Sequence, residues 1–346
     1  MSPKTRATIK DVARIAQVSP KSISRVINGE PGVSEETRQR ILEAISDLGY
    51  VTNTAARQLR GTAKVIGLVT SGFEDYAGQV VRGMSQAAQH FGYNLVLYVQ
   101  HSEGQNADDY RAFLGNGMIS GLLMVVPHDY QMLTELCSAD ELPYVMLDYQ
   151  GSTPAETIPT VTVTNRKGVL EAAHYLMALG HRHIGFITGE MEMASARERL
   201  QGYQEALGEI GIRYDPTLVA NGNWTPELGF TQMRTLMERH PEMTALIASD
   251  DLTAFGAMDA VKDSGLRVGE DISIIGFDDI PMAANVHPPL TTIRQPMLQM
   301  GHAAVELLIA LIEDRAPVDV RREYATELVI RQSTGRAAES DTSSSP

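Results

Sequence analysis

The stretch TIKDVARIAQVSPKSISRVING, residues 8–29, predicts two short helices that meet at a tight turn. Apolar side chains recur at helical spacing in its first half, and Thr8 can cap that helix. Ser19 can cap the second helix, and Pro20 suits the first helical position because its missing N–H would be unpaired there anyway. This arrangement is typical of a helix-turn-helix, whose second helix enters the major groove of DNA.

The second helix has an apolar side and a polar side. Ile23 and Val26 can pack against the first helix. The residues expected to face outward are Lys21, Ser22, Arg25 and Asn28. The alternative is a helical hairpin with solvated charges, but the capped turn and the split polarity favour DNA binding.

A third helix and a short linker are predicted next. Ser34 begins the helix, acidic residues occupy its first turn, where the helix dipole favours them, and Gly49 ends it. Residues 53–61, NTAARQLRG, leave room for only two helical turns. A helix that short is unstable alone in water because its nucleation is unfavourable. We therefore expect the linker to be helical only when a partner holds it.

Charge is divided unevenly along the 346 residues. Residues 1–62 carry ten Lys and Arg against six Asp and Glu, a net charge of +4, whereas the rest of the chain carries −18. We expect the basic head alone to meet phosphate. The one cysteine, Cys137, permits no internal disulfide and fits a cytoplasmic protein. No apolar run reaches 18 residues, and the N-terminus lacks the apolar core of a signal peptide, so neither a membrane span nor secretion is expected.

From residue 63 onward, apolar runs alternate with amphipathic helical stretches. The runs are 65–71, 94–100, 121–127, 144–149, 183–189, 245–250 and 272–279. The clearest helical stretches are 77–91, 166–179, 225–239 and 296–312. Strands that are apolar at nearly every position belong to sheets covered on both faces. The pattern therefore predicts an α/β fold with parallel sheets.

Nearly the whole chain resembles the lactose-repressor (LacI/GalR) family of transcription regulators. The resemblance rests on TIKDVARIAQVS, SRVING, VSEETRQRI and LGYVTNTAARQLR near the N-terminus. It continues through ALGHRHIGFITG, SARERLQGY, ASDDLTAFGAM, GLRVGEDISIIGFDD and PPLTTIRQP. It implies an N-terminal all-α helix-turn-helix head and a two-lobed, periplasmic-binding-protein-like α/β core.

The resemblance also implies domain boundaries. The expected parts are the head (1–52), a hinge helix (53–62), an effector-binding and dimerisation core (63–336) and a disordered tail (337–346). The core should divide into an N-lobe (about 63–161 and 292–322) and a C-lobe (about 162–291 and 323–336), with crossings near residues 161, 291 and 322. The tail lacks apolar heptads, so we expect a homodimer and no tetramerising coil.

The DNA contacts follow from the exposed residues and from the family pattern. Lys21 and Arg25 would read base edges of a palindromic operator, whereas Pro20 could offer only apolar contact, for example to a thymine methyl. The expected phosphate contacts are Thr8, Ser22 and Asn28. The hinge-helix residues implied by the resemblance are Asn53, Ala56 and Leu59. Leu59 stands where the family's leucine wedges between base pairs in the minor groove.

The candidate effector site lies at strand ends, because open α/β lobes bind ligands there. Asp148 and Asp250 end apolar runs. In the resembled family, Arg197 matches an arginine that grips the ligand, Asp278 an aspartate that accepts its hydrogen bonds, and Trp224 an aromatic that stacks on its ring. Further candidates are Phe73, Tyr76 and Gln295. The second acids of the ASDD and GFDD pairs, Asp251 and Asp279, are expected to be structural caps.

Each of these assignments has an alternative. Arg197 and Asp278 could be ion-pair scaffolding, Trp224 could be core, and Phe73 and Tyr76 could serve packing. Asp250 stands where many relatives have asparagine. A carboxylate accepts but cannot donate, which favours a hydroxyl-rich or amine-bearing ligand over an anionic one. A tryptophan with nearby Asp and Arg is typical of sugar sites, so a saccharide is the favoured effector.

The sequence thus predicts a DNA-binding transcriptional regulator, most simply a repressor of carbohydrate-utilisation genes controlled by a small molecule. The alternatives are a solute-binding protein, a sugar-processing enzyme and a regulator that responds to a purine or another non-sugar effector. A solute-binding protein would need a secretory signal and no DNA-binding head. No nucleophile elbow and no phosphate-cradling glycine loop occurs, so no catalytic residues are expected. Neither a cofactor nor a metal is expected.

Overall fold

The computed structural model describes residues 9–27, 31–48, 64–72, 75–100, 107–114, 118–127, 129–148, 158–315 and 319–337. The chain divides into two compact units, Met1–Ala63 and Lys64–Pro346. Seven of the residues named above lie outside the described ranges: Thr8, Asn28, Gly49, Asn53, Ala56, Leu59 and Phe73. The same holds for nearly all of the expected hinge helix and tail.

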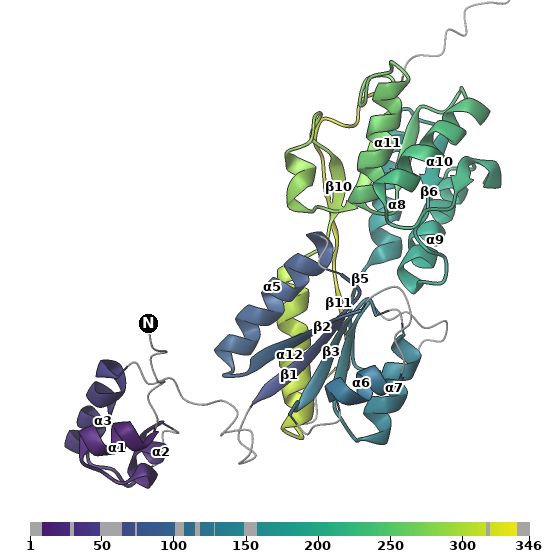
Figure 1. The fold of residues 1–346 in the computed structure, drawn as a ribbon. Coiled ribbons are helices and arrows are strands. Elements are labelled where there is room, and N and C mark those ends of the chain that lie inside the picture. The colour runs from purple at the N-terminus through teal and green to yellow at the C-terminus, as the bar shows by residue number, and fades with distance from the viewer. Residues whose placement is uncertain are drawn as a thin grey trace, which may run out of the picture. The chain divides into compact units, whose positions relative to one another are not determined.

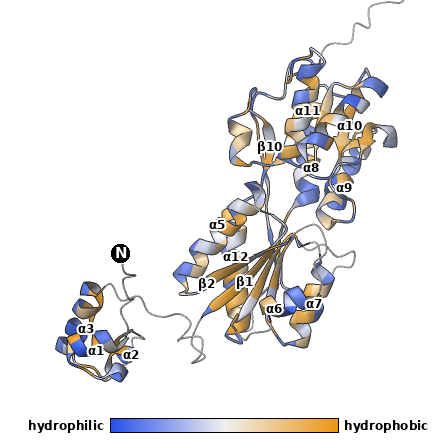
Figure 2. Ribbon diagram, viewed as in Figure 1, coloured by the Kyte–Doolittle hydropathy of each residue, from blue (hydrophilic) through white to orange (hydrophobic). Residues whose placement is uncertain are grey.

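The first unit is a three-helix domain. Its helices are α1 (Ile9–Ala16), α2 (Pro20–Ile27) and α3 (Glu35–Asp47). Its core consists of Val12, Ala16, Ile23, Val26, Ile41 and Ala44. The amphipathic pattern that predicted helices over residues 8–29 therefore also identifies the faces they bury. Figure 2 shows the hydropathy of the residues along these helices.

The second unit contains two lobes, each built on a six-stranded sheet (Figure 1). The N-lobe sheet has the order β11-β5-β4-β3-β1-β2, and every pairing in it is parallel. Its strands are β1 (Val65–Thr70), β2 (Asn94–Val99), β3 (Gly121–Val125), β4 (Tyr144–Leu147), β5 (Thr160–Val163) and β11 (Arg321–Tyr324). Its helices are α5 (Asp75–His90), α6 (Ala107–Leu114), α7 (Tyr130–Ala139) and α12 (Met297–Ile312). The helices α5 and α12 cover one face, and α6 and α7 cover the other (Figure 1).

The C-lobe sheet has the order β12-β10-β9-β8-β6-β7 and is parallel except for the β10–β12 pair. Its strands are β6 (Ile184–Ile187), β7 (Val219–Ala220), β8 (Ala245–Ala248), β9 (Ser273–Asp278), β10 (Thr291–Arg294) and β12 (Glu327–Val329). Its helices are α8 (Asn165–Ala178), α9 (Ala194–Glu209), α10 (Pro226–Arg239) and α11 (Asp251–Asp263), with short 3-10 turns at Pro216–Leu218 and Pro281–Ala284. The parallel two-lobed α/β core expected from the sequence is confirmed.

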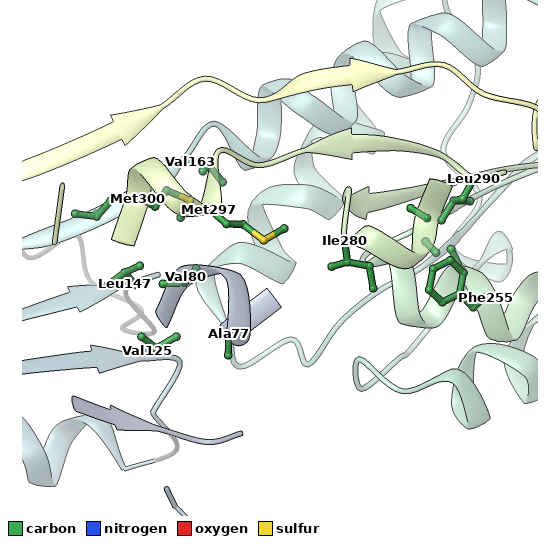
Figure 3. Packing of buried hydrophobic residues seen from close by; sticks show 14 of the residues in the cluster. Ala77, Val80, Val125, Leu147, Val163, Phe255, Ile280, Leu290, Met297 and Met300 are labelled. Atoms are coloured by element: carbon green, nitrogen blue, oxygen red, sulfur yellow. The ribbon is translucent and has the colours of Figure 1, made fainter. Parts of the chain in front are cut away.

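The chain passes between the lobes three times: from β5 to α8, from β10 to α12, and from β11 to β12. The apolar strands are buried because helices cover both sheet faces; β1, β3 and β9, for example, are buried at every position. One cluster of buried side chains continues through both lobes, from Val80 and Met300 to Phe255 and Leu290 (Figure 3). The strand ends that face the space between the lobes thus belong to two sheets, each of which is packed against its own helices.

Candidate functional site

The first candidate site is the exposed side of α2. Pro20 and Lys21 are exposed and Arg25 is half-buried, whereas Ile23 and Val26 are buried in the three-helix core. The Ser22 N–H donates to Ser19 Oγ over 3.1 Å, which is the expected N-cap. The hydroxyls of these two serines are also 3.0 Å apart. The Ser19 cap is followed by a proline and by polar residues. This order therefore places Lys21 and Arg25 on the outward side of α2, whose other side is buried in the three-helix core.

The second candidate site is a cavity of about 410 Å³ in the core unit, lined by residues of both lobes. This volume is within the range of small-molecule sites, about 300–1,000 Å³. Its polar lining residues are Ser71, Asp75, Tyr76, Asp148, Glu190, Ser195, Arg199, Asn223, Thr225, Asp250, Asp278 and Gln295. Trp224 and several aliphatic side chains complete it. The cavity thus combines apolar walls with converging polar groups, as ligand sites do.

Backbone strain is concentrated at the cavity wall. Four residues that line it have left-handed φ angles: Val126 (45°), Asp148 (53°), Trp224 (65°) and Asp278 (120°). A positive φ is unfavourable for residues other than glycine, most of all for a β-branched residue. Such strain persists only where the surroundings fix it, and it gathers at binding sites. The sharp turns at the ends of β3, β4 and β9 therefore direct side chains into the cavity.

The buried carboxylates of the cavity already have hydrogen-bond donors. Tyr76 donates its hydroxyl to Asp148 Oδ2 over 2.5 Å. The Gln295 amide donates to Asp278 Oδ1 over 2.6 Å. Asp250 caps α11 by accepting from the Thr253 N–H over 3.1 Å. These bonds fix the orientation of the carboxylates and leave further acceptor capacity on them, because a carboxylate has about four lone-pair sites.

Burial raises the pKa of all three carboxyls. The pKa of Asp278 rises to about 8, chiefly through desolvation and against the attraction of Arg199. Desolvation also raises the pKa of Asp148 and of Asp250, and hydrogen bonds to the ionised forms partly offset it. Tyr76 has a pKa well above its usual value because of burial and then the Asp148 charge. These pKa shifts thus show chiefly that the acidic groups of the cavity are shielded from water.

The arginine in the cavity is Arg199, and the prediction of Arg197 is corrected. Arg197 does not line the cavity, and its guanidinium donates to the backbone oxygens of Met191 and Glu192. Arg199 is buried on the same helix, two residues further on. Residues two apart on an α-helix point about 200° apart, so only one of the two can face the cavity.

Arg199 is held on all sides. Its Nε donates to Asn165 Oδ1 over 2.9 Å, and its Nη1 donates to the Ser249 backbone oxygen. The guanidinium carbon lies 3.6 Å from the centre of the Phe277 ring and 5.5 Å from that of Trp224. Within the part of the chain that the structure describes, two of its five N–H donors are therefore bonded to protein oxygens.

Trp224 lies flat against Gly189. A β-carbon at Gly189 would come within 1.9 Å of the indole, so only glycine permits this contact. The indole Nε1 and the Oε1 of Gln295 are both buried and have no hydrogen-bond partner. Unpaired buried polar atoms are costly. Both atoms belong to residues that line the cavity, and each would gain a hydrogen bond if a small side-chain movement let a ligand reach it.

The structure therefore brings together six of the eight predicted effector residues: Tyr76, Asp148, Trp224, Asp250, Asp278 and Gln295. Arg197 lies elsewhere, and Phe73 is outside the described residues. The sequence did not point to the other polar residues that line the cavity: Ser71, Asp75, Glu190, Ser195, Arg199, Asn223 and Thr225. The spacing in SARER offered the Arg199 signal, but it did not reveal which arginine faces inward. Asp251 and Asp279, expected to be structural, do not line the cavity.

Comparisons with known proteins identify the family of both parts of the chain. Residues 8–53 match the model of bacterial regulatory proteins of the lacI family, and residues 173–334 match that of the periplasmic binding protein-like domain. The HTH-type transcriptional regulator CelR of Thermobifida fusca is 35% identical over 96% of this chain and 100% of that relative. A PurR repressor of Aliivibrio salmonicida is 33% identical over 94% of this chain and 98% of that relative.

Solved structures of transcriptional regulators also match this chain over nearly its full length. A complex of CelR with cellobiose matches with a TM-score of 0.74 and 33% identity, covering 95% of this chain and 100% of that chain. A lac repressor dimer bound to operator and the anti-inducer ONPF matches with a TM-score of 0.81 and 30% identity, over 96% and 100% of the two chains.

A helix-turn-helix head joined to a two-lobed ligand-binding core defines an effector-controlled DNA-binding regulator. The chain belongs to the LacI family of transcriptional regulators. It is not an enzyme, since its relatives are named as regulators and repressors. Among the residues that the structure describes, no helix could span a membrane.

Proposed function

We propose that this protein represses carbohydrate-utilisation genes and that an uncharged saccharide in the interlobe cavity controls its affinity for a palindromic operator. The observation that carries this proposal is the charge balance of the cavity. Of the described residues that line it, five are acidic, namely Asp75, Asp148, Glu190, Asp250 and Asp278, and Arg199 is the one that is basic. Asp278 has a pKa of about 8 and is mostly protonated near neutral pH, so an anionic ligand would be repelled by the other four acids. Arg199, which also donates to two protein oxygens, would have to offset that repulsion.

A saccharide satisfies what this cavity offers. Its hydroxyls can donate to the buried carboxylates and to the unpaired Gln295 Oε1, and its oxygens can accept from the Trp224 Nε1. The indole also presents an apolar surface next to these polar groups. The relative CelR has been solved with cellobiose, which makes a neutral disaccharide the first probe to choose. The PurR relatives and the aromatic wall make a purine base the second candidate.

The DNA-binding role falls to α2 and the linker. Lys21 and Arg25 are proposed to read base edges, and exposed Pro20 to make apolar contact. Thr8, Ser22 and Asn28 are proposed to contact phosphates, and Asn53, Ala56 and Leu59 of the hinge helix (53–62) to bind the minor groove.

The protein is proposed to act as a cytoplasmic homodimer that associates with the nucleoid when it binds its operator. The strand β2 forms one edge of the N-lobe sheet and exposes the apolar side chains of Val96 and Leu97. An apolar sheet edge of this kind requires a partner to avoid nonspecific association. A second copy is the partner we propose, because the chain covers the full length of a lac repressor solved as a dimer.

The effector class can be tested by thermal shift on the full-length protein. A ligand at 100 times its Kd adds about 2.7 kcal/mol to the free energy of unfolding. We expect cellobiose to raise the melting temperature and cellobionate, its carboxylate counterpart, to leave it unchanged at equal concentration. Hypoxanthine tests the purine alternative. A larger shift with cellobionate or hypoxanthine than with any neutral sugar would contradict the proposal.

A further inference from the structure

The turn that carries Asp278 continues with a second strained residue. Asp278 has a φ of 120° and Asp279 a φ of 58°. Asp278 lines the cavity, whereas Asp279 does not. The Asp279 side chain is only 8% exposed. Two consecutive residues in the left-handed region need strong external restraint, because each one alone would relax to a negative φ.

The restraint on the Asp279 carboxylate comes from two arginines. Arg294 Nε lies 2.6 Å from its Oδ2, and Arg331 Nη2 lies 2.5 Å from its Oδ1. Each arginine is itself fixed: Arg331 Nη1 donates to the Leu290 backbone oxygen over 2.7 Å, and Arg294 Nη1 lies 3.4 Å from a Glu327 oxygen. The carboxylate is therefore paired through both oxygens, with the mostly buried Arg331 on one and the half-exposed Arg294 on the other.

The backbone of the same turn is held from the opposite side. The Asp279 N–H donates to Thr292 Oγ1 over 3.3 Å, and the Ile280 N–H donates to Asp251 Oδ2 over 2.9 Å. The Thr292 hydroxyl in turn donates to Asp251 Oδ1 over 2.5 Å. Asp251 is fully buried, so these bonds are shielded from water.

The restraining groups come from segments that lead into the interlobe crossings. Arg294 is the last residue of β10, and the chain then passes through Gln295 to α12 in the N-lobe. Arg331 lies two residues beyond β12, which begins directly after the crossing from β11. Asp279 thus joins two of the three crossings to the turn that presents Asp278.

We propose that Asp279 is a positioning residue for effector binding, which acts with Arg294 and Arg331 by holding the Asp278 carboxylate toward the cavity. The inference rests on the proposed function of the cavity as the effector site. A binding group must be held within about 0.5 Å of its productive position to contribute fully. Without the two ion pairs, the turn relaxes and the Asp278 carboxylate leaves that position, although no ligand contact has been removed.

The test compares full-length variants by calorimetric titration with cellobiose. Asp279→Asn removes the charge at nearly constant shape, and Arg331→Gln removes one partner. We expect each variant to lose at least tenfold in cellobiose affinity, and Arg331→Lys to recover part of that loss. Arg267→Gln is the matched control, because Arg267 also pairs with two acids of the C-lobe but is 64% exposed and does not line the cavity. The control should bind cellobiose as the wild type does.

A double-mutant cycle separates positioning from general stabilisation. If Asp279 acts through Asp278, Asp279→Asn should weaken binding much less in an Asp278→Asn background than in the wild type. Equal losses in both backgrounds, or a lower melting temperature with unchanged affinity, would overturn the proposal. If Asp279→Asn does not fold, Arg331→Lys in the same cycle provides the milder perturbation.

A second measurement does not require a known ligand. Trp224 is the one tryptophan of the chain, and it contacts the Arg199 group that stacks on Phe277, the neighbour of Asp278. We expect Asp279→Asn to shift the Trp224 emission and its quenching by acrylamide, and Arg267→Gln to leave both unchanged. If wild-type protein binds no sugar, the proposed function fails while this readout still decides whether Asp279 positions the turn. An unaltered emission in Asp279→Asn would then refute positioning.

Discussion

The stability of the protein should depend on pH through Asp278. The pKa of this residue lies at about 8 in the folded protein and near 4 in an unfolded chain. The folded state therefore holds a proton that the unfolded state releases. This contribution to stability is complete below pH about 4 and is lost as the pH rises through about 8. Between pH 5.5 and 8.5, we expect the unfolding free energy of ligand-free protein to fall by an amount on the order of a few kcal/mol. The melting temperature should fall with it.

Asp278→Asn provides the control for this prediction. The amide cannot titrate, so the variant should show a clearly flatter profile in differential scanning calorimetry. Asp148 and Asp250 shift in the same direction and will leave a residual slope. The surface acids with lowered pKa, such as Asp271, titrate below this window. A variant profile as steep as that of the wild type would show that another group carries the effect.

The two arginines of α9 supply a matched pair. Arg199→Gln leaves buried acceptors on Asn165 and Ser249 without their donor and should destabilise the core by about 2–4 kcal/mol. Arg197→Gln should cost less than about 1 kcal/mol, since its bonds to Met191 and Glu192 are made near the surface. Urea unfolding measures both. Equal losses would mean that the phase of α9 differs from the structure.

At the scale of elements, the sequence was most informative where periodicity and burial coincide. The apolar runs at 65–71, 121–127 and 272–279 correspond to β1, β3 and β9, because parallel strands covered on both faces must be apolar throughout. Helical phase was the weak point. SARER places two arginines on one helix, and only tertiary packing determines which of them is buried. The left-handed turns at Val126 and Asp278 were equally unpredictable, because a positive φ is a genuine outlier for valine and is uncommon even for aspartate.

The space around two helical glycines predicts opposite effects of an alanine substitution on stability. A β-carbon at Gly301 of α12 would lie 2.2 Å from the Val80 backbone oxygen of α5, so the two helices can only pack this closely with glycine there. Gly301→Ala should destabilise the core by about 1–3 kcal/mol. Gly208 of α9 has open space around it, so Gly208→Ala should stabilise by up to about 1 kcal/mol. Chemical denaturation of the two variants should give changes of opposite sign.

In the whole molecule, the three crossings between the lobes are bonded to one another or to the cavity wall, which the proposed regulation by a ligand would use. The crossing from β5 to α8 and that from β11 to β12 are hydrogen-bonded to each other, with Thr326 N–H donating to Thr164 Oγ1 over 3.0 Å. The third crossing carries Gln295, which donates to Asp278. A ligand bound between the lobes would therefore contact the third crossing at Gln295, and a coupling of about 1–3 kcal/mol between ligand binding and DNA binding would be typical.

The separation of DNA reading from ligand binding gives the last prediction. Arg25 lies on α2 of the first unit, and the effector cavity lies wholly in the second. Arg25→Ala should weaken binding to an operator selected from random DNA by about 1–3 kcal/mol relative to unrelated DNA, because a base contact carries that much discrimination. Arg14→Ala is the control, because it removes the same charge from an exposed position on α1. It should therefore weaken binding to the selected operator and to unrelated DNA alike. Fluorescence anisotropy at fixed salt measures both, and cellobiose affinity should match the wild type in each variant. Loss of sugar affinity in Arg25→Ala, or equal loss of specificity in Arg14→Ala, would show that α2 is not the reader.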